Sequence, residues 1–174
     1  VTMNEYDSFG RPYSVYRPVP TQTSSGAYAS FASVNPELLR FYNWEVYAFS
    51  KTLYEDSPLD RPVEKYGPGS LWHTRGKSVR TEYLVNEATG VLSCGLYLVS
   101  SDTSLTRSGV FPSGSLSVVK TTDEDGDVTL SFTDRLGRKV LERRLDGDIR
   151  LDTHYVYDDL GLTRYVLTPE ATAA

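Results

Sequence analysis

Apolar and polar residues alternate over several short stretches of this chain, with the period of two that is typical of β-strands. At residues 78–85 the alternation places four residues on one face: Val79, Thr81, Tyr83 and Val85. It recurs at residues 128–132, and Gly-containing turns follow at intervals of 10 to 14 residues. This spacing predicts an all-β fold built of consecutive antiparallel β-hairpins.

The connections between the predicted strands differ in character. Asp125-Gly126 lies between two apolar-alternating stretches, and this dipeptide predicts a two-residue type I′ hairpin turn because both positions tolerate positive φ. Residues 101–108 are polar and predict a loop. The tight turn and the loop are both compatible with a hairpin array.

One short helix interrupts the strand pattern. Asn35 can cap a helix, Pro36 suits its first position, and apolar residues then follow at helical spacing from Leu38 to Val46. We therefore expect a helix of two to three turns that starts after Asn35. It lies in an insertion, within a single domain divided as 1–20 (first repeat), 21–52 (loop and helix insertion), 53–112 (middle module) and 113–170 (C-terminal repeats).

Composition and charge narrow the possible functions. The chain has 174 residues, 13 of them Tyr, and a net charge of −5, which argues against nucleic acid as a partner. The basic stretch from Arg135 to Arg144 contains Glu142 and predicts solvated strand faces with cross-strand ion pairs. Cys94 is the single cysteine, so no internal disulfide or cysteine metal cluster can form, and we expect a buried, inert thiol. No cofactor or metal is predicted.

A short motif recurs along the chain: an aromatic or apolar strand end, an acidic turn, and then Gly, often followed by Arg. A looser copy spans residues 54–62. Because one hairpin cannot bury its apolar face alone, such repeats must stack on neighbours. The motif residues are Tyr6, Asp7, Gly10 and Arg11; Asp134, Gly137 and Arg138; and Tyr157, Asp158 and Gly161.

These units resemble the YD repeats of the RHS family, which are large bacterial surface and toxin-associated proteins. Residues 54–72 resemble the non-repeat stretch of a bacterial RHS subfamily with a characteristic N-terminal module. Thr133 stands where the motif would have Tyr, and Leu162 where it would have Arg. The Asp is expected to accept backbone N–H groups in the turn, the Gly to supply a permissive φ, and the Arg to reach a nearby carboxylate or carbonyl.

The resemblance implies a strip of stacked hairpins that curls into a shell, which in characterised relatives encloses a toxin. The expected partners are the remaining repeats of the parent protein and an enclosed toxin or effector, in an extracellular or cell-envelope location. No toxin or protease signature appears in this sequence, so neither activity is transferred. Exposed sheet edges also predict a homodimer.

A second hypothesis is a carbohydrate-binding module. Tyr66, Trp72 and His73 lie on or beside a Gly/Pro-rich stretch, and an aromatic ring in such a loop can stack on a sugar. A Trp that packs into the core at a hairpin end is the commoner arrangement, and His154, next to Tyr155 in a strand, is expected to be a packed or surface imidazole.

An enzyme is the third hypothesis. Acidic residues in turns, such as Asp56, Asp60, Asp158 and Asp159, could supply a glycosidase pair. The acidic run at 123–127 lacks the downstream Glu of a calcium-binding EF-hand loop and is better explained as a hairpin tip. No nucleophile elbow, zinc-protease helix or phosphate-binding loop is present. We therefore expect a structural protein rather than an enzyme.

Overall fold

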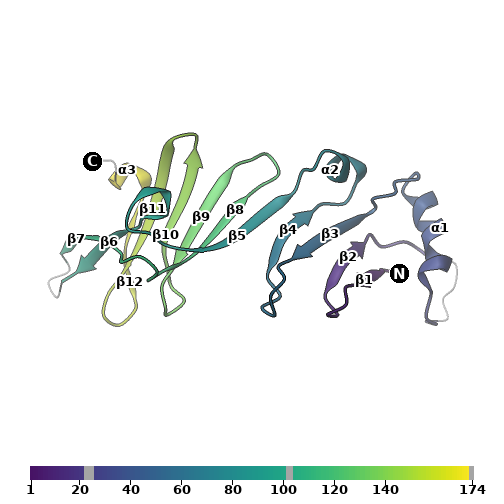
Figure 1. The fold of residues 1–174 in the computed structure, drawn as a ribbon, viewed down its shortest axis with the longest axis horizontal. Coiled ribbons are helices and arrows are strands. Elements are labelled where there is room, and N and C mark those ends of the chain that lie inside the picture. The colour runs from purple at the N-terminus through teal and green to yellow at the C-terminus, as the bar shows by residue number, and fades with distance from the viewer. Residues whose placement is uncertain (22–25, 101–103, 173–174) are drawn as a thin grey trace. The chain divides into compact units, whose positions relative to one another are not determined.

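A computed structural model describes residues 1–21, 26–100 and 104–172. The chain divides into two compact units, Val1–Arg80 and Thr81–Ala174. The prediction of an all-β fold is confirmed, because antiparallel strands account for most of the regular structure in both units (Figure 1). None of the described helices is long and apolar enough to cross a membrane.

The first unit is an antiparallel sheet with two short helices. Its strands follow the chain in the order β1-β2-β3-β4-β5, and β5 continues into the second unit. The elements are β1 (Asn4–Tyr6), β2 (Pro12–Tyr16), α1 (Phe31–Phe41), β3 (Phe49–Tyr54), β4 (Pro62–Tyr66), α2 (Ser70–Thr74) and β5 (Val79–Val85).

Helix α1 starts earlier than predicted. It begins at Phe31 after Ser30, whose carbonyl accepts the N–H groups of Ser33 and Val34, and Pro36 lies inside the helix rather than at its start. The expected cap at Asn35 is therefore wrong. The earlier start places Val34 and Leu38 one turn apart on the same face. They are buried in a cluster with Tyr16, Val19 and Ala48, and this apolar burial compensates for the backbone hydrogen bond that Pro36 cannot make.

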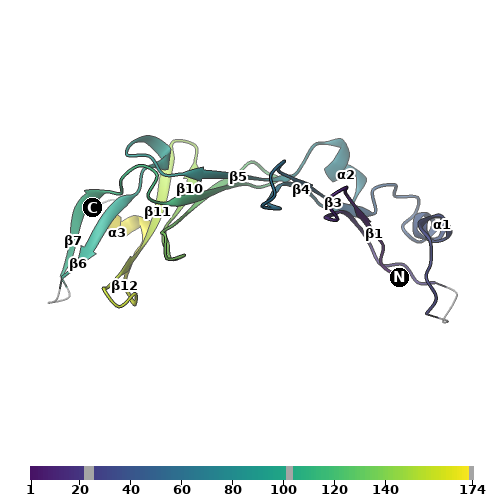
Figure 2. The same ribbon diagram turned by 60° about the horizontal axis from the view of Figure 1, so that its bottom comes forward.

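The second unit is a six-stranded antiparallel sheet with a separate hairpin, β6–β7. The sheet order is β5-β8-β9-β10-β11-β12 (Figure 1), and β6 and β7 form a two-stranded sheet of their own (Figure 2). The elements after β5 are a 3₁₀ turn (Gly90–Leu92), β6 (Gly95–Val99), β7 (Leu105–Val110), β8 (Ser117–Thr122), β9 (Val128–Thr133), β10 (Lys139–Asp146), β11 (Ile149–Tyr157), β12 (Thr163–Leu167) and α3 (Pro169–Thr172).

The core of the second unit follows from the strand alternation. Leu130 and Phe132 of β9 point to the same side, where Leu141 of the neighbouring strand meets them. The full buried cluster is Cys94, Leu116, Val118, Leu130, Phe132, Val140 and Leu141. Burial raises the pKa of the Cys94 thiol to about 12, so the side chain behaves as a small apolar residue, as expected.

Three local predictions were wrong. Helices α2 and α3 accompany α1, so the chain has more than the one helix expected, and residues 105–108 of the predicted loop belong to β7; residues 101–103 lie outside the described part. In the β8–β9 hairpin only Gly126 of the Asp-Gly pair has positive φ, 95°. The loop spans Asp123 to Asp127 and is therefore not a type I′ turn.

Candidate functional site

Four hairpin turns share one geometry, which we call the aspartate turn. Each begins with Asp, has Gly at the fourth position, and closes with a hydrogen bond from the Asp N–H to the carbonyl of the fifth residue. The Gly residues have φ between 79° and 95°, a region that other residues rarely adopt. The turns are Asp7–Arg11, Asp123–Asp127, Asp134–Arg138 and Asp158–Leu162.

The Asp side chain holds each of these turns from within. In the turn at Asp134, Oδ1 accepts the N–H groups of Leu136 and Arg138, both at 2.9 Å. Asp7, Asp123 and Asp158 accept the corresponding N–H groups at 2.8–3.0 Å. The hydrogen bond from Leu162 N–H, together with the nearby Arg164, holds the pKa of Asp158 below its usual value. The Asp therefore has the role that was expected from the motif.

Two further closures are expanded versions of this turn. Glu55 N–H donates to the Arg61 carbonyl at 3.0 Å, and the Arg61 guanidinium binds both Glu55 oxygens. Asn86, fully buried, exchanges hydrogen bonds with Leu116: Asn86 N–H to the Leu116 carbonyl at 3.1 Å, and Leu116 N–H to Asn86 Oδ1 at 2.8 Å. Asn86 thus closes β5 against β8, while the described residues between 87 and 115 lie outside this sheet.

Two of the aspartate turns also carry an arginine that contacts the next hairpin. Arg138 Nε donates to Asp134 Oδ2 at 2.8 Å, its guanidinium lies 4.8 Å from the Tyr157 ring centroid, and the Tyr157 hydroxyl donates to the Lys139 carbonyl at 2.8 Å. We call this the arginine–tyrosine clamp. It links one turn to the strand end that opens the following turn.

The first unit repeats the clamp. Arg11 Nε donates to Asp7 Oδ2 at 2.7 Å, and its guanidinium lies 4.7 Å from the Tyr54 ring centroid. The Tyr54 hydroxyl donates to the Pro12 carbonyl at 3.1 Å, the residue after Arg11, as Lys139 follows Arg138. Tyr54 and Tyr157 therefore each cover the arginine of the preceding aspartate turn.

The two departures from the motif have structural counterparts. Where Leu162 replaces Arg, Arg164 donates from Nε to Asp158 Oδ2 at 2.6 Å, so the carboxylate keeps a guanidinium partner. Thr133 pairs with Ser117 on β8, and the residue before Ser117 is the buried Leu116 rather than an arginine. A tyrosine at 133 would therefore have no guanidinium to cover.

The predicted aromatic site is only partly assembled. The His73 ring stacks between Tyr47 (centroids 4.6 Å apart) and Tyr66 (5.3 Å), and its Nε2 lies 3.3 Å from the Phe49 carbonyl oxygen. Trp72 lies instead on α2, not in a loop as expected, and its ring covers Gly67 and Gly69. Tyr66 and His73 therefore present ring faces to each other, while Trp72 supports the Gly-Pro-Gly bend.

A carboxylate fixes α2 beside this aromatic cluster. Glu45 accepts hydrogen bonds from the Ser70 hydroxyl, from Ser70 N–H at 3.0 Å and from Tyr47 N–H at 2.8 Å. The Ser70 bonds hold the pKa of Glu45 below its usual value. Glu45 thus caps the helix and orients Tyr47, which is a folding role.

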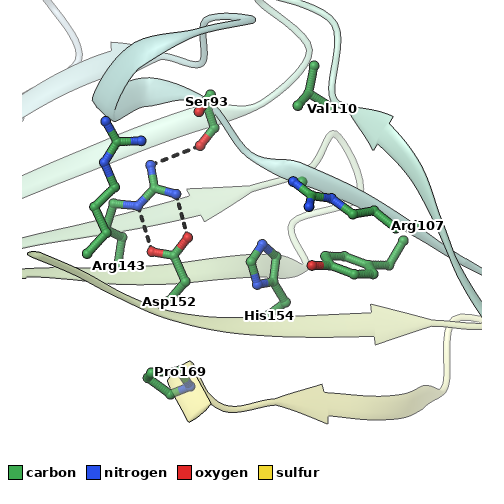
Figure 3. A pocket seen from close by; sticks show the side chains of 10 residues that line it. Ser93, Arg107, Val110, Arg143, Asp152, His154 and Pro169 are labelled. Carbon is green, nitrogen blue, oxygen red and sulfur yellow. Dashed lines mark hydrogen bonds and ion pairs between the residues drawn. The ribbon is translucent and has the colours of Figure 1, made fainter. Parts of the chain in front are cut away.

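A pocket of about 280 Å³ lies in the second unit between the excursion 87–115 and strands β10 and β11 (Figure 3). Its centre is an ion pair: Arg143 Nε donates to Asp152 Oδ1 at 2.7 Å, and Arg143 Nη2 donates to Oδ2. Arg143 Nη1 also donates to the carbonyls of Val91 (2.6 Å) and Ser93 (3.0 Å). The buried arginine thereby ties the excursion to the sheet.

His154 lies in this pocket between the Arg143–Asp152 pair and Arg107 (Figure 3). The side chain is buried, and neither ring nitrogen has a hydrogen-bond partner in the described structure. Burial lowers the pKa of His154, which favours the neutral imidazole. The prediction of a packed imidazole agrees with this burial but gave no indication of the unpartnered nitrogens.

Arg143 is the functional residue that sequence reasoning placed wrongly. The expected cross-strand ion pair exists, but Arg143 is 4% exposed rather than solvated. The strand alternation carried the signal, because Leu141, Arg143 and Leu145 share one face of β10. An arginine between two core-facing leucines requires a buried partner, and Asp152 opposite it supplies one.

Two of the four carboxylates considered for catalysis have structural partners in the described residues. Asp60 lies 3.4 Å from Arg11, and Asp158 holds its own turn. Among the described residues no group of three or more His, Cys, Asp or Glu could hold a metal ion.

The first 85 residues match the model of a domain of unknown function, DUF6443. No curated protein and no solved structure matches the chain.

Proposed function

We propose that this chain is a structural β-repeat segment of a bacterial RHS/YD-repeat protein, secreted or displayed on the cell surface. In this role it contributes to a shell or scaffold that encloses or presents a toxin or effector, and it has no enzymatic activity of its own. The observation that carries the proposal is the arginine–tyrosine clamp, which occurs in both units with the same contacts.

The motif residues support a mechanical role because their polar atoms are used within the fold. Asp7 and Asp134 bind backbone N–H groups of their own turns, and their arginines bind the next hairpin. Residues that are fully engaged in this way stabilise a stacked array. Tyr6 is the motif tyrosine without a described guanidinium partner and is 58% exposed, as expected if another repeat supplies its arginine.

The alternative, a carbohydrate-binding module centred on Trp72, has less support. Tyr66 and His73 stack on each other, and Trp72 covers the Gly67–Gly69 bend. Ring faces that are already covered contribute little stacking area to a sugar.

The direct test is electron cryo-microscopy of the full-length gene product that contains this chain. We expect hairpins before and after it to continue the same array, with an arginine of another repeat over Tyr6. A cryo-microscopy map in which the 174 residues form an isolated globular domain, with non-repeat domains on both sides, would overturn the proposal.

Separated from other repeats, the chain should self-associate through its sheet edges. Strand β12 has one neighbour, β11, in the described sheet order, and its Val166 is 52% exposed. Sedimentation velocity at increasing concentration should show a dimer that Val166→Lys weakens. A monomer at all concentrations would contradict this expectation.

A further inference from the structure

Three arginines line the pocket in the second unit, and only one of them has a carboxylate partner among the described residues. Arg143 is balanced by Asp152, but Arg107 and Arg150 form no ion pair with any described residue, and both line the same pocket. Arg150 donates one hydrogen bond, to the Gly90 carbonyl at 3.0 Å. Two uncompensated guanidinium groups on a concave surface attract an anion, and their planar donor pattern suits a carboxylate.

The remaining polar groups suit hydroxyls. The Asp152 carboxylate can accept further hydrogen bonds beyond those from Arg143, and the buried His154 lacks a partner for both nitrogens. A neutral imidazole offers one donor and one acceptor, which matches a hydroxyl group. Gly95 leaves room here, because a Cβ at that position would lie 3.1 Å from Tyr97 Cε2 and 3.4 Å from His154 Nε2.

The size and charge of the pocket disfavour phosphate and purely apolar ligands. A pocket of about 280 Å³ is at the small end of ligand sites, large enough for one sugar ring. The Asp152 carboxylate repels a doubly charged phosphate more strongly than a singly charged carboxylate, and beside the latter it stays free to accept hydrogen bonds from hydroxyl groups. The arginines disfavour a purely apolar ligand because burying them would leave charged groups unpaired.

We propose that this pocket binds an acidic sugar of the uronic-acid class, with its carboxylate at Arg107 and its hydroxyls facing Asp152, His154 and the more distant Arg150. The pocket wall formed by Ser93, Gly95, Tyr97, Arg107 and Val110 belongs to the excursion 87–115, and its floor belongs to β10 and β11. This site is independent of the aspartate turns and of the structural role proposed above.

The test is a titration of the whole chain with D-glucuronate by isothermal calorimetry and by NMR, with D-glucose and inorganic phosphate as comparison ligands. Glucuronate should bind and glucose should not, because glucose lacks the carboxylate. The double variant Arg107→Gln/Arg150→Gln should weaken binding at least about tenfold, since each charged hydrogen bond contributes on the order of a tenfold change.

Two further variants test whether a loss of binding is specific to the pocket. Arg144→Gln removes an exposed arginine next to Arg143 on the opposite face of β10 and should leave binding unchanged. Gly95→Ala places a methyl against the Tyr97 ring and beside His154, and it should also weaken binding. Unchanged circular dichroism in each variant distinguishes lost binding from lost fold. Phosphate binding as tightly as glucuronate, an equal effect of Arg144→Gln, or no binding at millimolar ligand would each overturn the proposal.

Discussion

The Tyr157 ring lies over the guanidinium of Arg138 at 4.8 Å, while its hydroxyl bonds the carbonyl of the residue that follows that arginine. The Tyr157 side chain thus contacts both the arginine of the preceding turn and the backbone next to it. Tyr54 makes the same two contacts around Arg11 in the other unit. A residue that appears in the sequence to belong to its own turn therefore acts mainly on its neighbour.

The clamp should appear as a coupling energy. In a double-mutant cycle of Arg138→Gln and Tyr157→Leu, urea denaturation should give an interaction of about 0.5–1 kcal/mol, the usual range for a partly exposed cation over a ring. Thr133→Tyr is the control and should add no stability, because Leu116 rather than arginine precedes its partner on β8. Additive single-mutant effects would show that the two residues act separately.

The stability of the aspartate turn depends on its first residue far more than on its middle residues. Asp134→Ala removes the acceptor of two backbone N–H groups and of Arg138, and should lower the free energy of unfolding by about 1–3 kcal/mol. Arg135→Ala, an exposed position in the same turn, should change it by less than about 0.5 kcal/mol. The measurement is urea denaturation of both variants. Equal effects would contradict the assigned role of Asp134.

The buried ion pair should be intolerant of losing one partner. Asp152→Asn leaves the Arg143 charge buried without a carboxylate and should cost about 3–5 kcal/mol in unfolding free energy. Glu142→Gln breaks the partly exposed pair with Lys139 on the same strand and should cost no more than about 1 kcal/mol. Comparable losses in thermal denaturation of the two variants would mean that Arg143 is solvated in solution.

Stability should fall with acidity in two separate windows. Because the pKa of buried His154 is lowered, the unfolded state binds more protons than the folded state as the pH falls below about 6.5. The contribution of His154 to the free energy of unfolding is therefore present above pH of about 6.5 and is lost as the pH falls toward the folded-state pKa. Asp134 and Asp158 also have lowered pKa values, and their contributions are lost below pH of about 4.

The variant His154→Gln separates these two windows. In melting temperature against pH, it should abolish the decline that starts near pH 6.5, taken as the unfolded-state value, while the more acidic decline remains. A wild-type curve that is flat from pH 7 to pH 5 would contradict the assignment to His154.

The sequence was sufficient for the strand pattern and the turns because both depend on local rules. Alternation located β5 and β9, and the Gly-containing dipeptides located the turns between the strands of the C-terminal third. The start of α1 could not be predicted locally, since the preference of Pro36 for a first helical position competes with burial of Val34 against Tyr16. Tertiary packing decided that competition.

The pocket could not be predicted from local sequence patterns, for a different reason. Arg107 and His154 are far apart in the chain, and they meet because residues 87–115 leave the sheet and return to it. Only the position of Arg143 on the core face of β10 indicated a polar site at all. Long-range placement of this kind depends on where the excursion lies, and the strand pattern does not contain that information.

The Asn86–Leu116 closure has a consequence for how such a protein can change. Because two hydrogen bonds at Asn86 complete the β5–β8 pairing, the β6–β7 hairpin can vary in sequence while the ladder stays intact, whereas Cys94 packs in the core and must stay apolar. One wall of the arginine-lined pocket is made by residues of that hairpin, and the floor by strands β10 and β11. Exchange of the β6–β7 hairpin alone would therefore alter the ligand preference proposed for this pocket, much as an interchangeable loop does on an antibody framework.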